Sequence, residues 1–193
     1  MFPLLALLLV LPSCLSHEVK DNTSERLEAA RFSQRIKALK QFAETQNACC
    51  TYGILIDMSK PSSQNRLFVV NLQADSVVIA GLCAHGSGKQ YNGETVIFSN
   101  EPGSLLSSEG RYKIGAKYYG AFGMSYRLHG LDSTNSKAFE RAVVFHSLSC
   151  VPDEEGEPLC LSHGCPMVSP NVLKKTAALI DQVQQPMLMW VYK

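Results

Sequence analysis

The spacing of hydrophobic and polar residues changes near residue 50 and divides the chain into a helical part and a β-rich part. Between residues 24 and 46, apolar side chains recur every three or six positions with Arg and Lys between them, which predicts an amphipathic helix. Asn22, with Glu25 at capping-box spacing, and Ser24 are the candidates for its N-terminal cap. We therefore expect a helix to precede the β-rich part.

Short β-branched and apolar runs between turn-forming residues predict the strands of the second part. They cover residues 52–57, 66–71, 76–80, 95–98, 110–114, 125–130, 143–146 and 187–192. Short turns join the first three runs, which favours an antiparallel meander over βαβ units. We expect a helical turn over 135–141 and a helix over 171–184, with Ser169 as its cap and Pro170 at its first position. The whole pattern predicts a mainly β (α+β) fold with an N-terminal helix.

The first residues of the chain are strongly apolar. Residues 2–15 form a run that is too short to span a bilayer, which takes about 20 residues, but that fits the core of a secretory signal. No Lys or Arg precedes Lys20, so the basic start of such a signal is missing. We expect a signal peptide over 1–16, a helical extension over 17–48 and a β-rich domain over 49–193. The signal predicts secretion across the cytoplasmic membrane into the periplasm or cell envelope.

Cys14 gives a second way in which the signal could end. Leu11-Pro12-Ser13-Cys14 has the outline of a bacterial lipobox, and a lipidated Cys14 would anchor the protein to the membrane. The alternative is ordinary cleavage near Ser16, which would discard Cys14. The sequence leaves both possibilities open.

Charge and composition narrow the class of protein. The formal net charge is +1 and no basic block is present, so we expect no nucleic acid as a partner. With 193 residues and 46% hydrophobic content, the chain can form one domain with a real core. The Cys-x-x-Cys spacing of a structural zinc site does not occur, so we expect no metal.

The seven cysteines favour an oxidising compartment over the cytosol. Cys150 and Cys160 bracket an acidic loop that contains Pro and Gly, and they are the pair that we favour for a disulfide. Two reduced cysteines in a flexible loop are the alternative.

The candidate chemistry lies in the stretch 161–166, Leu-Ser-His-Gly-Cys-Pro. A cysteine attacks an acyl carbon only as the thiolate, and a nearby imidazole is the usual way to form one. His146, upstream at the end of a predicted strand, is the candidate base for Cys165, and His163 is its rival. Gly164 permits a sharp turn in which the amides of Gly164 and Cys165 could both point at a developing oxyanion.

An ordered series of further motifs precedes this stretch. It consists of Ala84-His85-Gly86-Ser87-Gly88, Phe98-Ser99-Asn100, Gly103-Ser104, Ser107-Ser108-Glu109-Gly110-Arg111-Tyr112, Tyr119-Gly120, Gly130-Leu131-Asp132 and Asn135-Ser136. Together with His146 and the Ser-His-Gly-Cys element, the series resembles the murein L,D-transpeptidase catalytic domain family, the second branch of YkuD-like proteins. The resemblance covers roughly residues 51–193. It implies the YkuD-like catalytic fold for the domain expected over 49–193.

The resemblance also implies roles for the residues of the site. Cys165 would be the nucleophile and His146 the general base, with its second ring nitrogen oriented by the carbonyl of Ser147. Gly164 completes the catalytic set, and the candidates for substrate binding are His163, Ser162, His85 and Tyr119. The residues by themselves also allow a hydrogen-bonded structural role for His85 and a core position for Tyr119. For Ser162 they allow either support of the turn through its hydroxyl or a solvated loop position.

The implied reaction is acyl transfer on peptidoglycan stem peptides, without a metal or organic cofactor. Cys165 would attack the carbonyl of the third stem residue and expel the terminal D-alanine, and an amine or water would then resolve the thioester. A murein carboxypeptidase or hydrolase is one alternative, and a secreted wall-binding module without turnover is another.

The way in which the substrate is held is not defined by the motifs. Pro166 and Met167 follow the cysteine, where the main YkuD-like branch usually has a basic or amide residue. Arg111, Arg127 and Arg141 are candidates for binding a substrate carboxylate, and the sequence cannot choose among them.

Overall fold

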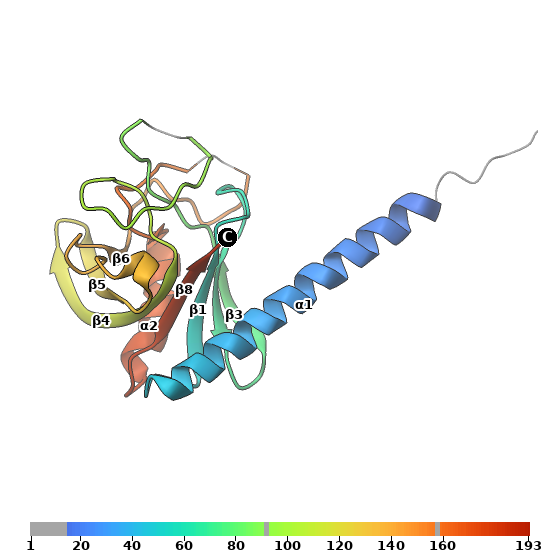
Figure 1. Ribbon diagram of the computed structural model, residues 1–193, viewed down its shortest axis with the longest axis horizontal. Helices are drawn as coiled ribbons and strands as arrows, with labels where there is room; N and C mark the ends of the chain where they lie inside the picture. The colour runs from blue at the N-terminus through green and yellow to red at the C-terminus, as the bar shows by residue number, and fades with distance from the viewer. Residues whose placement is uncertain (1–14, 91–92, 157–158) are drawn as a thin grey trace, which may run out of the picture. The chain divides into compact units, whose positions relative to one another are not determined.

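One eight-stranded sheet organises residues 35–193 (Figure 1). The computed structural model describes residues 15–90, 93–156 and 159–193. Its elements are α1 (Leu15–Thr45), β1 (Tyr52–Asp57), β2 (Leu67–Asn71), β3 (Ser76–Gly81), β4 (Gly110–Gly120), β5 (Gly123–Gly130), a 3-10 helix η1 (Ser133–Asn135), β6 (Val144–Ser147), β7 (Met167–Val168), α2 (Pro170–Gln182) and β8 (Leu188–Tyr192). The predicted mainly β fold with an N-terminal helix is confirmed.

Two groups of strands meet at β8, and the order across the sheet is β3-β2-β1-β8-β4-β5-β6-β7. β1, β2 and β3 form the predicted antiparallel meander, and β4, β5 and β6 form a second one. β8 lies between them, parallel to β1 and antiparallel to β4. β7 extends the far edge, parallel to β6, and thereby brings the segment that precedes it beside β6.

Alternation along β6 separates the main core from the opposite face of the sheet. Phe145 is fully buried in the main core, which α2 helps to cover. Val144 and His146 point to the other face, because successive side chains of a strand alternate. Met167, the register partner of His146, belongs to a smaller cluster on that face. The face opposite the main core is therefore the one that carries the candidate base.

α1 begins earlier than the sequence pattern indicates. The helix is already present at Leu15, the first described residue, so Asn22 and Ser24 lie inside it and the predicted cap is wrong. No Gly or Pro interrupts residues 15–24, and a helix continues where nothing breaks it. The chain divides into two compact units, residues 1–34 and 35–193, and α1 contributes to both.

Within the unit 35–193, the last turns of α1 are part of the core. Ile36, Leu39 and Ala43 are 3%, 0% and 0% exposed, at the spacing of one helix face. Leu39 packs directly on Gly53 of β1, where a Cβ would lie 2.7 Å from the leucine methyl group. Arg35 stacks over the rings of Trp190 and Tyr192 on β8.

The N-terminal predictions fall mainly outside the described residues. Residues 1–14, which include Cys14 and most of the expected signal peptide, are not among them. In the part of the chain that the structure describes, no helix combines the length and the apolar character needed to cross a membrane.

Three further predictions need correction. The expected strand over 95–98 does not form, because only Phe98 finds a partner, in an isolated bridge to Ser107. β4 continues to Gly120, past the predicted end at residue 114, because its second half pairs with β5 in a hairpin. The helical turn expected over 135–141 begins two residues earlier, as the 3-10 helix Ser133–Asn135, and continues in turns that include the helical hydrogen bond from the Arg141 amide to the Lys137 carbonyl.

The start of α2 and the disulfide agree with the sequence analysis. Ser169 Oγ accepts a hydrogen bond from the Val172 amide at 3.1 Å, and Pro170 is the first helical residue. Cys150 and Cys160 form a disulfide with their Cα atoms 5.8 Å apart. This disulfide closes the loop between β6 and the stretch 161–166.

Candidate active site

The β6–β7 ladder places Cys165 beside β6. His146 pairs with Met167 and Ser147 with Val168 in parallel register. Cys165 continues this register on the N-terminal side of β7, where its Sγ accepts a hydrogen bond from the Val144 amide at 3.4 Å. The thiol and His146 therefore lie on neighbouring segments, because Cys165 is next to Val144, which comes two residues before His146. This pairing brings His146, at the end of a strand, close to the loop that carries Cys165, as the sequence predicts.

His146 is oriented by the chain that follows it. Its Nδ1 lies 3.4 Å from the carbonyl oxygen of Ser147, the position that the resemblance implies. A carbonyl can only accept, so the proton of a neutral imidazole resides on Nδ1 and Nε2 keeps its lone pair. His146 is 2% exposed, and the ring of Phe122 stacks on it at 4.5 Å between centroids. The β4–β5 hairpin thus covers the imidazole through Phe122.

A tight turn presents Cys165. Gly164 has φ +112°, in the left-handed region that favours glycine, and a Cβ there would lie 2.8 Å from the Leu106 carbonyl oxygen. Ser162 Oγ donates to the Cys165 carbonyl at 2.7 Å and accepts from the Gly164 amide at 3.1 Å. The Gly164 amide is thus engaged inside the turn, which leaves the Cys165 amide as the candidate oxyanion donor of this stretch.

Arg141 holds the loop of residues 99–108, which contacts the turn at Gly164. Its guanidinium donates to the carbonyl oxygens of Ser99 and Leu106 at 2.7 and 2.5 Å, and to the Ser108 hydroxyl at 2.7 Å. From the sequence, Arg141 is only a candidate for binding a substrate carboxylate. Its partners lie 33 to 42 residues away along the chain, so no local pattern indicates this structural role.

The predicted substrate-binding residues differ in their surroundings. His85 is 1% exposed: its Nδ1 accepts from the buried Arg66 at 2.9 Å and its Nε2 donates to the Gly93 carbonyl at 3.1 Å. Ser162 is also buried, and its amide donates to the His85 carbonyl, so the two segments are linked. The hydrogen-bonded structural histidine is the better account of His85, and Ser162 supports the turn through its hydroxyl instead of lying in a solvated loop.

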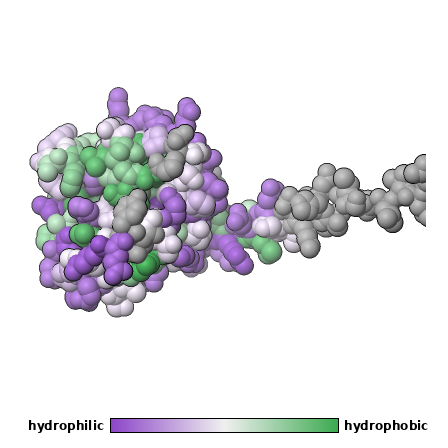
Figure 2. All heavy atoms as spheres, turned by 90° about the horizontal axis from the view of Figure 1, so that it is seen from above, coloured by the Kyte–Doolittle hydropathy of each residue, from purple (hydrophilic) through white to green (hydrophobic). Residues whose placement is uncertain are grey.

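His163 and Tyr119 face solvent. His163 is exposed beside Gly164, and Tyr119, at the β4–β5 hairpin, is 76% exposed. Phe122, from the same hairpin, is 47% exposed although it stacks on His146. His163 and Phe122 are available to a ligand that approaches the face of Cys165 and His146. Tyr119 pairs with Met124, which packs against the main core, so Tyr119 points to the opposite face of the sheet. The space-filling view shows that hydrophobic residues gather on one exposed part of the molecule (Figure 2).

Burial suppresses charge on both candidate catalytic side chains. It raises the pKa of the Cys165 thiol, although the Val144 amide and the charge of Arg141 act in the opposite direction. It lowers the pKa of His146, while the bond to Ser147 partly opposes the shift. A neutral thiol beside a neutral imidazole is therefore the resting state near pH 7. Within the described residues no hydrogen bond joins the two, and such bonds often tighten only when substrate is present.

No candidate metal site is found in the described ranges. Among residues 15–90, 93–156 and 159–193, no group of three or more His, Cys, Asp or Glu side chains could hold an ion. The chemistry that the site can support with its own side chains is nucleophilic attack by sulfur with an imidazole as proton acceptor.

Comparisons with known proteins identify what the chain is similar to. The family model described as the L,D-transpeptidase catalytic domain matches residues 23–192. No curated protein sequence matches the chain significantly. A solved structure of a variant of the helical cell shape determining protein Pgp2 from Campylobacter jejuni is similar with a TM-score of 0.50 and 11% identity, over 74% of this chain and 47% of that one.

A solved L,D-transpeptidase from Mycobacterium smegmatis has a TM-score of 0.42 and 14% identity, over 74% of this chain and 59% of that one. The chain therefore spans between 47% and 59% of the length of these two solved chains. At such identities a structural likeness shows the fold alone. The family match confirms the resemblance found in the ordered motifs.

Proposed function

This chain belongs to the L,D-transpeptidase catalytic domain family, and on that premise we propose that it is a cysteine acyltransferase that acts on peptidoglycan stem peptides through a thioester on Cys165. The observation that supports this most is the register of β6 and β7. It holds Cys165 Sγ against the Val144 amide, two residues before a histidine whose Nε2 is free to accept a proton.

In the first step, Cys165 Sγ attacks the carbonyl carbon of the third stem residue while its proton passes to His146 Nε2. Burial keeps both groups neutral beforehand, so the proton transfer accompanies the attack. The Ser147 carbonyl stabilises the imidazolium that forms, because it accepts from Nδ1–H. The Cys165 amide is the donor that we assign to the developing oxyanion.

In the second step, the tetrahedral intermediate collapses. The C–N bond to the terminal D-alanine breaks, and His146 returns the proton to the departing amine. An amine of a second stem, or water, then attacks the thioester carbon and gives up a proton to His146. The C–S bond breaks, the Cys165 sulfur takes the proton back, and the product is a new amide or a carboxylate. The same two side chains serve both outcomes, so transfer and hydrolysis differ in the acceptor.

The proposed substrate also defines where the protein would act. Peptidoglycan lies in the cell envelope, so the proposal includes export of the protein to the periplasm or cell envelope. Anchoring through a lipidated Cys14 and the absence of a nucleic-acid partner stay predictions.

The first test is the intact mass of the folded, reduced protein after incubation with a carbapenem, a β-lactam whose carbonyl an activated nucleophile opens. We expect one adduct per protein molecule in the wild type, none in Cys165→Ala and strongly slowed formation in His146→Ala. An adduct of equal rate in Cys165→Ala would place the nucleophile elsewhere. No adduct on wild type would favour a wall-binding module without turnover.

Product analysis separates transfer from hydrolysis. With a stem tetrapeptide and an amine acceptor, transfer yields a new amide and free D-alanine, whereas a carboxypeptidase yields only the tripeptide and D-alanine. Exclusive hydrolysis at saturating acceptor would replace the transferase proposal by the carboxypeptidase alternative.

A further inference from the structure

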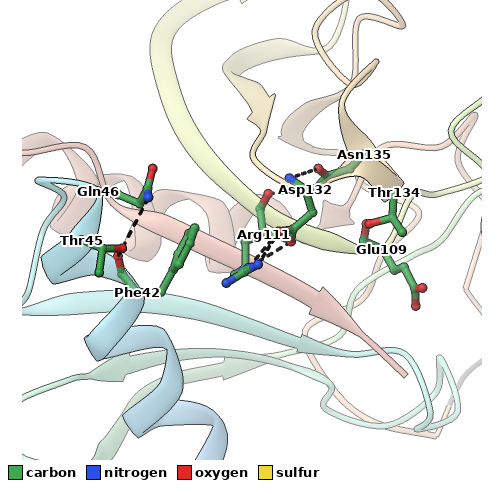
Figure 3. Close-up of polar contacts among 8 residues, drawn as sticks. All are labelled: Phe42, Thr45, Gln46, Glu109, Arg111, Asp132, Thr134 and Asn135. Carbon is green, nitrogen blue, oxygen red and sulfur yellow. Dashed lines mark hydrogen bonds and ion pairs between the residues drawn. The ribbon is translucent and has the colours of Figure 1, made fainter.

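The arginines of the unit 35–193 fall into two groups according to what occupies their guanidinium groups. Arg66 donates to the Cys83 carbonyl at 2.7 Å and to His85. Arg141 donates to the Leu106 carbonyl of the loop that contacts Gly164. Arg111 pairs with Asp132 through both carboxylate oxygens, as Figure 3 shows. Each of these three guanidinium groups is held by hydrogen bonds to acceptors of the protein. Arg111 and Arg141 are therefore poor candidates for a substrate carboxylate.

Arg127 belongs to the second group. Within the described residues its side chain forms no hydrogen bond and no ion pair, although the residue is half-buried. Its guanidinium carbon lies 4.5 Å from the centre of the Tyr118 ring and 5.9 Å from that of Phe139. Aromatic rings attract a guanidinium without using its N–H donors, which point outward from its edge. The stacking fixes the side chain and leaves all five donors for a ligand.

The sheet register places Arg127 on the face of the candidate nucleophile. Arg127 pairs with Val144, the residue whose amide contacts Cys165, and Ser125 pairs with His146. Paired residues of neighbouring strands point to the same face, so Arg127 shares the face of His146. With strands about 4.8 Å apart, the backbones of Arg127 and Cys165 are roughly 10 Å apart. A stem residue spans about 3.3 Å, so a carboxylate within three residues of the attacked carbonyl can reach Arg127.

The surroundings of Arg127 are cationic. Lys113 pairs with His129 on β5, two residues after Arg127. Burial and then the charges of Lys113 and Arg127 lower the pKa of His129, so both cations lie close to this ring. Two positive side chains, Lys113 and Arg127, therefore lie near the same ring on this face.

We propose that Arg127 binds a carboxylate of the acyl donor and so sets the position of the stem peptide across β5 and β6. The proposal rests on the proposed function, because the stem peptide is its ligand. It assigns to β5 the cationic contact that Pro166 and Met167 after the cysteine do not supply. The carboxylate has two sources in a stem: the terminal D-alanine, or the side chain of the third residue where that residue carries one.

The test measures binding in the Cys165→Ala background, so that it does not depend on turnover. Three tetrapeptide probes are compared by calorimetry: the free acid, its C-terminal amide, and a peptide whose third side chain lacks the carboxylate. We expect the free acid to bind about tenfold more tightly than one of the two modified peptides, as for a charge-assisted hydrogen bond. The probe that loses affinity identifies the source.

Substitution then assigns the discrimination to Arg127. Arg127→Gln should remove the tenfold difference, and Arg127→Lys should restore part of it, since Lys keeps the charge but not the planar fork. Arg35→Gln is the matched control: Arg35 also stacks on two rings, but β4, β5 and β6 separate its ring partners on β8 from Cys165. This control should keep the full discrimination.

Three outcomes overturn the proposal: undiminished discrimination in Arg127→Gln, equal binding of all three probes, or no binding of any. The carbapenem experiment decides the proposed function separately. Discrimination at Arg127 without acylation of the wild type would support the carboxylate site and refute the transferase.

Discussion

At the scale of single residues, each of two histidines on the catalytic face is covered by one phenylalanine. Phe122 stacks on His146 at 4.5 Å, and Phe139 stacks on His129 at 4.8 Å. Burial is the first cause of the lowered pKa of both imidazoles. The two pairs provide reciprocal controls, because only one of them lies beside Cys165.

We predict that Phe122→Ala raises the pKa of His146 and leaves that of His129 unchanged, and that Phe139→Ala does the reverse. Removal of a ring admits water, which favours the charged imidazolium. The measurement is an NMR titration of the imidazole C–H signals. Because His146 must be neutral to accept a proton, Phe122→Ala should also move the acidic limb of the acylation rate to higher pH. An unchanged His146 titration would mean that other groups bury the ring.

At the scale of elements, the loop between β6 and the Cys165 turn is the part that a covalent bond closes. The Cys150–Cys160 disulfide spans a sequence separation of 10 residues. Val151 and Leu159, one from each side of the loop, are buried with Met167 of β7. The disulfide and this small cluster together fix the segment that leads to Cys165.

We predict that the double variant Cys150→Ala/Cys160→Ala loses about 3 kcal/mol of unfolding free energy, because its unfolded chain is no longer restricted. Urea unfolding of the double variant, and of wild type with and without reductant, measures the loss. Cys50→Ala is the control, since Cys50 is half-buried and free. A double variant as stable as the wild type would show that the apolar cluster holds the loop by itself.

The elements also show what sequence can and cannot predict. β1 was predicted to the residue, because a continuous apolar run lies between clear turns. The run 95–98 has similar residues but lacks a neighbouring strand to pair with, and hydrophobic spacing does not reveal partners. For the site, the motif brings His146 and Cys165 together, whereas Phe122 and Arg127 reach that face only through β4–β5 and β5–β6 pairing. Long-range register is the information that the local pattern lacks.

At the scale of the whole molecule, the compact unit begins inside a helix. The sequence analysis expected the domain to start at residue 49, a boundary that stays a prediction, while the chain's own contacts divide it after Gln34. The difference concerns residues 35–48, which include the buried Leu39.

We predict that a variant lacking residues 1–34 unfolds with nearly the free energy of the full chain, whereas one lacking residues 1–48 is strongly destabilised. Leu39→Ala should cost about 2–5 kcal/mol, as a buried leucine does. Leu27→Ala is the matched control on the same helix, because Leu27 is 55% exposed and its loss should have little effect. Thermal unfolding by circular dichroism compares all four. Equal stability of the two shortened chains would support the boundary at residue 49.

The position of β8 has a consequence for the order in which the protein can be assembled. β8 separates β1 from β4, and it pairs with both. During synthesis, the half-sheet with β1 and the half-sheet with Cys165 are both complete in sequence before residues 188–192 leave the ribosome. Until then they have no common strand. The nucleophile can therefore be positioned before β8 is available, while pairing between residues 84–87 and 162–167 is the backbone link between the two half-sheets, and the final strand then completes the single sheet.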